Sequence, residues 1–148
     1  MNTINNTELK QILVVDDEHK SVMGTIRELE RRGFSVDSVA TQDEASYRLR
    51  SRPYDAVLLD MKVPIVVAGD VMGDTPRAEY GLEVLHSLRS GQFETEGARN
   101  TTPVFIVTAL PPGASELEKA QTLGVEKIFY KPVSPILVAE TVRIALRQ

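Results

Sequence analysis

The sequence predicts an α/β domain in which five parallel strands form one sheet with helices on both faces. Five short apolar runs alternate strictly with segments of helical periodicity, which is the pattern of repeated β-α units. Four of the runs are dense in Val, Ile, Leu or Phe, as strands covered on both faces should be. The chain has 148 residues, and we expect residues 1–148 to form a single domain.

Each expected strand is bounded by a change from apolar to polar residues. The second run alternates instead of being continuously apolar, so we expect an edge strand with Phe34, Val36 and Val39 on one side. The five expected strands are residues 11–15 (QILVV), 34–40 (FSVDSVA), 55–59 (DAVLL), 103–109 (PVFIVTA) and 127–130 (KIFY).

Apolar spacing and end signals mark the helices between these strands. Gly33 and Gly124 stand where two helices should stop, because glycine readily adopts the left-handed conformation of a helix C-terminus. Thr41 and Ser134 are expected N-caps, and the segment beginning at Ser115 (SELE) has a capping-box pattern. The expected helices span residues 19–32, 41–50, 81–89, 115–123 and 134–147.

Two connections are longer than the roughly 2–6 residues that are usual in β-α units. Residues 65–80 (IVVAGDVMGDTPRAEY) follow the third strand and are interpreted as an insertion. This insertion is either a tolerated surface loop or, because its first half is apolar, a lid or a docking patch for a partner. It also brings Asp70 and Asp74 within reach of a metal ion bound at the ends of the strands. Residues 90–102 are expected to form a polar surface loop.

The bulk composition narrows the function classes. Net charge is -4 and the isoelectric point is about 5.2, so the composition does not favour binding to nucleic acid or to an anionic membrane. The absence of cysteine excludes a disulfide scaffold and a thiolate metal site. The first dozen residues do not resemble a signal peptide, and no apolar run approaches the ~18 residues of a membrane span. We expect a cytoplasmic protein.

Polar side chains follow four of the five expected strands. They are Asp16 and Asp17 after the first, Asp60 after the third, Thr108 at the end of the fourth and Lys131 after the fifth. In an open parallel sheet, the carboxyl ends of the strands share one edge, where ligands bind. Taken singly, an Asp is commonly a turn or cap residue, a Thr a cap and a Lys a solvated tip. Five such residues at one edge favour a functional site.

The chemistry of this set is specific. Three nearby carboxylates repel one another, and a divalent cation would relieve the repulsion. Because every donor is oxygen, Mg²⁺ is favoured, with Mn²⁺ as an alternative. Lys131 and Thr108 would face a phosphoryl group, one as a point charge and one as a hydrogen-bond donor. Asp60 could then act as a nucleophile on phosphorus and form an acyl phosphate.

Five motifs together resemble the receiver domain of two-component response regulators. They are ILVVDDE (12–18), AVLLDMKVP (56–64), GLEVLHSLR (81–89), VFIVTA (104–109) and GVEKIFYKPVSP (124–135). The resemblance covers almost the whole chain apart from the insertion. It implies a flavodoxin-like (βα)₅ fold, doubly wound, with the strand order 2-1-3-4-5.

The resemblance also assigns roles to single residues. It implies that Asp60 is the phosphoacceptor and that Asp16 and Asp17 bind the metal, with the backbone carbonyl of Lys62 as a further ligand.

The same resemblance makes Thr108 the switch hydroxyl that closes onto the phosphoryl group and Lys131 the lysine that pairs with it. It further implies a cis peptide bond between Lys131 and Pro132.

Three features depart from the family pattern. Ile128 stands three residues before the lysine, where the family usually has Tyr or Phe, so the ring that usually couples to the threonine is missing from this position. Pro111 and Pro112 stiffen the loop after Thr108. The insertion at residues 65–80 follows the phosphoacceptor loop directly.

The resemblance implies a phosphorylation switch that catalyses its own phosphorylation and dephosphorylation and is not otherwise an enzyme. A sensor histidine kinase or a phosphotransfer protein would donate the phosphoryl group, and the response would be binding to a downstream protein or a phosphorylation-dependent homodimer. One alternative is a pseudo-receiver that binds partners without phosphorylation. A less favoured one is an aspartyl-phosphate phosphatase of the haloacid-dehalogenase type, which needs an acid where Lys62 stands.

Overall fold

A single parallel sheet organises the protein. The computed structural model describes residues 9–66, 75–94 and 96–148. Its strands are all parallel and lie in the order β2-β1-β3-β4-β5, which confirms the expected fold class and strand order. The strands are β1 (Gln11–Val15), β2 (Ser35–Val39), β3 (Ala56–Leu59), β4 (Val104–Thr108) and β5 (Lys127–Tyr130).

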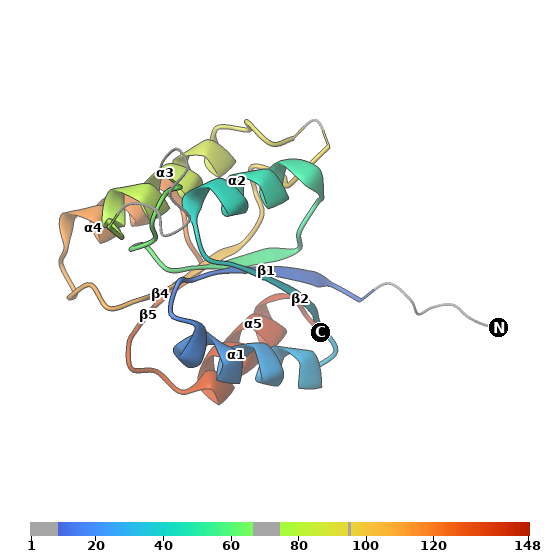
Figure 1. Ribbon diagram of the computed structural model, residues 1–148. Coiled ribbons are helices and arrows are strands. Elements are labelled where there is room, and N and C mark those ends of the chain that lie inside the picture. The colour runs from blue at the N-terminus through green and yellow to red at the C-terminus, as the bar shows by residue number, and fades with distance from the viewer. Residues whose placement is uncertain (1–8, 67–74, 95) are drawn as a thin grey trace.

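Helices cover both faces of the sheet. One face carries α1 and α5, and the other carries α2, α3 and α4 (Figure 1). Within the described residues, no helix combines the length and the apolar character needed to traverse a lipid bilayer. The helices are α1 (His19–Arg31), α2 (Gln42–Ser51), α3 (Ala78–Arg89), α4 (Ser115–Leu123) and α5 (Pro135–Ala145).

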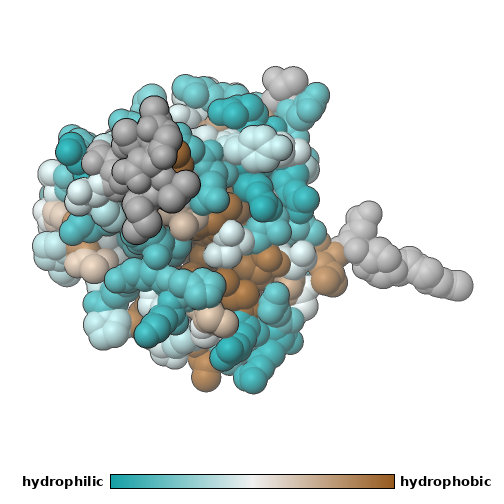
Figure 2. Space-filling view, viewed as in Figure 1, coloured by the Kyte–Doolittle hydropathy of each residue, from teal (hydrophilic) through white to brown (hydrophobic). Residues whose placement is uncertain are grey.

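Strand alternation divides the core into two apolar layers. Leu13 and Leu59 pack with α2, α3 and α4, whereas Ile12 and Leu58 pack with α1 and α5. Figure 2 shows hydrophobic surface in the middle of this view, between the more hydrophilic surfaces of the upper and lower helices. The central strands are therefore packed on both faces, and this packing holds in place the residues that follow their carboxyl ends.

The edge strand β2 confirms one expectation and corrects another. It lies at the sheet margin and pairs with β1 alone. Phe34 and Val36 pack into the layer of α1 and α5, but Val39 belongs to the opposite layer. The expectation that Val39 shares their side was wrong, because strand residues separated by an odd number of positions face opposite sides of the sheet.

The end signals of four helices are confirmed. The side chains of Thr41 and Ser134 accept hydrogen bonds from backbone N–H groups in the first turns of α2 and α5, at 3.1 and 3.3 Å. Gly33 and Gly124 adopt φ values of 91° and 105° just beyond α1 and α4. These are conformations that residues with a Cβ atom rarely adopt.

Two helix starts differ from the sequence expectation. Helix α4 begins at Ser115 itself, and the residue before it, Ala114, offers no side-chain cap, so the capping box is not formed. Helix α3 begins at Ala78, three residues before Gly81. A Cβ atom on Gly81 would lie 2.6 Å from the Cα atom of Met61, so glycine there lets α3 approach the loop that follows β3.

The long connection after β3 is anchored at both ends. Val63 and Arg77 form an antiparallel bridge in which the Arg77 N–H donates to the Val63 carbonyl at 3.2 Å. This bridge lies at the base of the region interpreted as an insertion, residues 65–80, whose last three residues belong to α3. Asp70 and Asp74 lie outside the described residues.

The connection before β4 is more than a polar surface loop. Phe93 and Ala98 are buried and join the core layer of α2, α3 and α4. The Ala98 N–H also donates to the carbonyl of Leu49 in α2 at 2.8 Å. The expectation for residues 90–102 missed this packing, because a buried side chain in a polar loop leaves no periodic signal.

Candidate functional site at the carboxyl edge of the sheet

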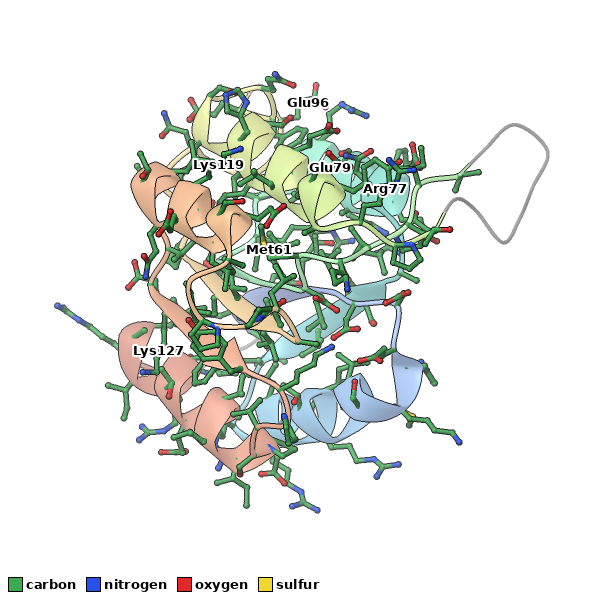
Figure 3. All side chains as sticks on the ribbon, turned by 90° about the vertical axis from the view of Figure 1, so that its left-hand side faces the viewer. Met61, Arg77, Glu79, Glu96, Lys119 and Lys127 are labelled. Carbon is green, nitrogen blue, oxygen red and sulfur yellow. The ribbon has the colours of Figure 1, made fainter. Side chains whose placement is uncertain are left out.

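The predicted polar residues meet at the carboxyl edge of the sheet. Figure 3 looks onto this edge, with Met61 labelled between the two helical layers. Backbone hydrogen bonds continue the sheet just past the strand ends, from Asp16 N–H to the Val39 carbonyl at 3.0 Å and from Asp60 N–H to the Val15 carbonyl at 2.8 Å. Asp16 and Asp60 are thus held by the sheet and not by a free loop.

Three carboxylates form a compact cluster. One oxygen from each of Asp16, Asp17 and Asp60 lies within 4.8 Å of the others. All three donors are carboxylate oxygens, the ligand type that Mg²⁺ and Mn²⁺ prefer. The donor set therefore fits a hard divalent cation. Lys62 donates its N–H to Asp60 Oδ1 at 3.1 Å, and the role of its carbonyl stays a prediction.

Lys131 brings positive charge to this cluster. Its Nζ atom donates to Asp16 Oδ2 at 3.0 Å, to Asp60 Oδ2 at 3.1 Å and to Glu18 Oε1 at 2.9 Å. The peptide bond between Lys131 and Pro132 is cis, as expected. The bond to Asp60 supplies the compensation that a carboxylate needs at the end of a buried strand.

The electrostatics of the cluster are strongly perturbed. Burial and the charge of Asp16 raise the pKa of Asp60 to about 6, although Lys131 opposes the shift. Burial and the charge of Asp16 also raise the pKa of Asp17. Burial alone would lower the pKa of Lys131, but its hydrogen bond to Glu18 and its acidic neighbours raise it. The metal-free cluster therefore holds excess negative charge at neutral pH, which a cation would relieve.

Thr108 is the last residue of β4, the strand next to β3, and has a different setting. Its side chain is fully buried, and its Oγ1 accepts a hydrogen bond from the Leu110 N–H at 3.2 Å. A cavity of about 470 Å³ extends from the carboxylates toward α1, and the described residues on its wall include Val107 and Ala109 but not Thr108. The Thr108 carbonyl accepts from the Lys131 N–H at 2.8 Å, so the backbones of both residues are linked.

Two residues of β5, Ile128 and Tyr130, bear on the coupling between the threonine and an aromatic ring. Ile128 is opposite Ile106 in β4 and packs partly against the layer of α2, α3 and α4. Tyr130 is opposite Thr108 and is 39% exposed. An aliphatic side chain thus occupies the position three residues before Lys131, and the nearby Tyr130 is partly exposed to solvent.

Glu18 is a site residue that sequence reasoning missed. It follows the two acids directly, but its carboxylate reaches Lys131, which lies 113 positions further along the chain. The hydrogen bond to Lys131 lowers the pKa of Glu18. The only sequence signal was a third acid after Asp16 and Asp17. Because an exposed Glu is common near the start of a helix, this signal does not indicate a contact with Lys131.

Similarity to known proteins agrees with this geometry. The sequence matches the response regulator receiver domain over residues 12–143. It is 27% identical over 145 residues to the transcriptional regulatory protein ResD of Bacillus subtilis, covering 98% of this chain and 51% of that protein. It is 30% identical over 140 residues to the phosphate regulon transcriptional regulatory protein PhoB of Rhizobium meliloti, covering 95% and 53%. The chain spans about half the length of these curated relatives.

Solved structures of receiver domains superimpose on most of the chain. A CheY-like receiver domain from Methanospirillum hungatei has a TM-score of 0.71 and 25% identity, with 95% of each chain covered. The receiver domain of the sensor histidine kinase PA1611 from Pseudomonas aeruginosa, whose cleft holds a magnesium ion, has a TM-score of 0.71 and 18% identity, with 95% and 100% covered. The chain belongs to the family of response regulator receiver domains of two-component signalling.

Proposed function

We propose that this receiver domain is switched by phosphorylation of Asp60. The observation that carries the proposal is the contact of Asp60 with Lys131 inside a cluster of three carboxylates. In the reaction, a carboxylate oxygen of Asp60 forms a bond to phosphorus, and the bond between phosphorus and the donor's nitrogen or oxygen breaks. The leaving group keeps the electron pair, and Asp60 becomes an acyl phosphate.

The neighbouring residues support this transfer. Asp16, Asp17, Asp60 and the carbonyl of Lys62 would hold Mg²⁺, or Mn²⁺, which supplies positive charge to phosphoryl oxygens when bound. Lys131 would donate hydrogen bonds to the same oxygens and stabilise the charge that develops on them. The protein thereby promotes its own phosphorylation and dephosphorylation without acting as an enzyme on other substrates.

The switch itself would involve Thr108. The residues on either side of it, Val107 and Ala109, line the cavity. We propose that the Thr108 hydroxyl moves to donate a hydrogen bond to the phosphoryl group. This movement would shift an existing equilibrium on the surface formed by α4, β5 and α5. Because Ile128 replaces the usual ring, the shift would reach this surface without the inward swing of an aromatic side chain.

Membership of the receiver family indicates the partners. The donor would be a sensor histidine kinase or a phosphotransfer protein in the cytoplasm. The recipient of the signal would be a protein surface or a second copy of this chain, not nucleic acid, since the net charge is -4. We also propose that residues 1–148 form one receiver domain, with residues 65–80 as an insertion in it.

Incubation with acetyl phosphate and Mg²⁺, followed by intact-mass measurement, tests the proposal. Wild-type protein should gain the mass of one phosphoryl group, and Asp60→Asn should gain none. Glu30→Gln removes one exposed charge at the far end of α1 and should behave as wild type. A wild-type protein that gains no mass under these conditions would instead support the pseudo-receiver, which the isoleucine at position 128 favours.

A further inference from the structure

Glu18 directly precedes α1 but does not cap it. Its backbone holds the N-cap position, and no side-chain hydrogen bond closes the first turn of the helix. The carboxylate accepts instead from Lys131 Nζ at 2.9 Å. This ion pair ties the connection between β1 and α1 to the connection between β5 and α5.

The hydrogen-bonding capacity of Lys131 is fully used. An ammonium group has three N–H donors and no acceptor. The three acceptors are carboxylate oxygens of Asp16, Glu18 and Asp60, at 3.0, 2.9 and 3.1 Å. A phosphoryl group brings three additional acceptor oxygens, so Lys131 can donate to one of them only by releasing a present partner.

The three partners differ in the cost of release. The side chains of Asp16 and Asp60 are each 6% exposed, whereas the side chain of Glu18 is 62% exposed. A buried carboxylate that loses its cation stays desolvated, which is costly. An exposed carboxylate is rehydrated at once, and its ion pair is worth little. Glu18 is therefore the partner that leaves most easily.

We propose that Glu18 is the exchangeable counter-ion of Lys131, which occupies its third N–H in the unphosphorylated protein and yields it to a phosphoryl oxygen. This inference rests on the proposed phosphorylation of Asp60. It makes Glu18 a residue that acts through Lys131, as a competitor that phosphorylation must displace.

The exchange requires movement of one side chain only. The Glu18 N–H donates to Asp16 Oδ1 at 2.8 Å, and the Ser21 hydroxyl donates to the Glu18 carbonyl at 3.1 Å. Both bonds hold the backbone of Glu18 in place while its carboxylate turns outward, away from the new negative charge. Phosphorylation thereby breaks the contact between the two connections and alters the charge at the start of α1.

A charge-removing substitution tests the exchange. At saturating Mg²⁺, Glu18→Gln should be phosphorylated by acetyl phosphate about two- to fivefold faster than wild type, the range expected for loss of one partly exposed ion pair. Glu30→Gln, within α1, makes the same change of net charge without touching Lys131, and its rate should equal that of wild type.

A second measurement needs no phosphorylation. In metal-free protein, an amine-acylating reagent should modify Lys131 about two- to fivefold faster in Glu18→Gln, because the amine loses one charged partner. Peptide mass spectrometry quantifies the modification, and Glu30→Gln again serves as the matched control. Equal acylation of Lys131 in both variants overturns the pairing.

The outcomes separate this inference from the proposed function. If Asp60 is phosphorylated but Glu18→Gln and Glu30→Gln react at the same rate, the counter-ion exchange is wrong and the phosphorylation switch stands. If wild-type protein accepts no phosphoryl group, the proposed function fails and the exchange fails with it.

Discussion

Replacing the proposed phosphoacceptor should stabilise the metal-free protein. Burial and the charge of Asp16 raise the pKa of Asp60 in the folded state from 3.8 to about 6. A carboxyl with a raised pKa contributes stability below its unfolded pKa and loses that contribution as the pH rises through the folded value. At neutral pH the folded protein therefore carries an ionised Asp60 at a net cost.

The magnitude follows from the shift. A difference of about 2 pKa units at 1.36 kcal/mol per unit corresponds to about 3 kcal/mol at pH values above both pKa values. Asn keeps the side-chain shape and removes the charge, but it weakens the hydrogen bond that Lys131 donates to Oδ2. We expect Asp60→Asn to increase the free energy of unfolding by about 1 to 3 kcal/mol near neutral pH.

Urea unfolding in EDTA provides the assay. The advantage of Asp60→Asn should be largest at about pH 7.5 and should shrink at about pH 4.5, where the folded wild type has bound the proton. Glu30→Gln controls for the change of net charge. The reasoning is refuted if Asp60→Asn is less stable than wild type near neutral pH, or if the gap is the same at both pH values.

Three further predictions address the metal, the loop after β3 and the connection before β4. Saturating Mg²⁺ should stabilise metal-free wild type by about 1 to 3 kcal/mol in thermal unfolding and should have no effect on Asp17→Asn; equal stabilisation of both would remove Asp17 from the metal site. Gly81→Ala should lower the free energy of unfolding in urea by about 1 to 3 kcal/mol, because its Cβ meets the backbone of Met61. The control is Gly24→Ala, whose Cβ meets only a proline side chain. Equal losses in both variants would contradict the close approach of α3 to Met61. Phe93→Ala should cost about 3 to 5 kcal/mol in the same assay, and a loss below about 1 kcal/mol would mean that the ring contributes little to the core.

Local sequence signals predicted most of the fold. The dense apolar runs located β1, β3, β4 and β5 to within a residue at each end, because buried parallel strands need continuous apolar side chains. Two errors concern local geometry. Val39 lies in the other core layer, because it is an odd number of positions from Val36, and Ser115 is the first residue of its helix instead of its cap.

Topology alone predicts that the site residues lie together, since the carboxyl ends of parallel strands share one edge of the sheet. Asp16, Asp17 and Asp60 do lie together, and Lys131 contacts two of them. The partnership of Glu18 with Lys131 could not be predicted, because it depends on the side-chain conformations of two residues distant in sequence.

Reductive trapping of the phosphorylated protein tests the central claim most directly. Borohydride reduces an acyl phosphate to an alcohol, so phosphorylated Asp60 would become homoserine, which peptide mass spectrometry locates. The account predicts homoserine at position 60 after treatment with acetyl phosphate and Mg²⁺, and none without the phosphoryl donor. Homoserine at another aspartate, or at none, would contradict it.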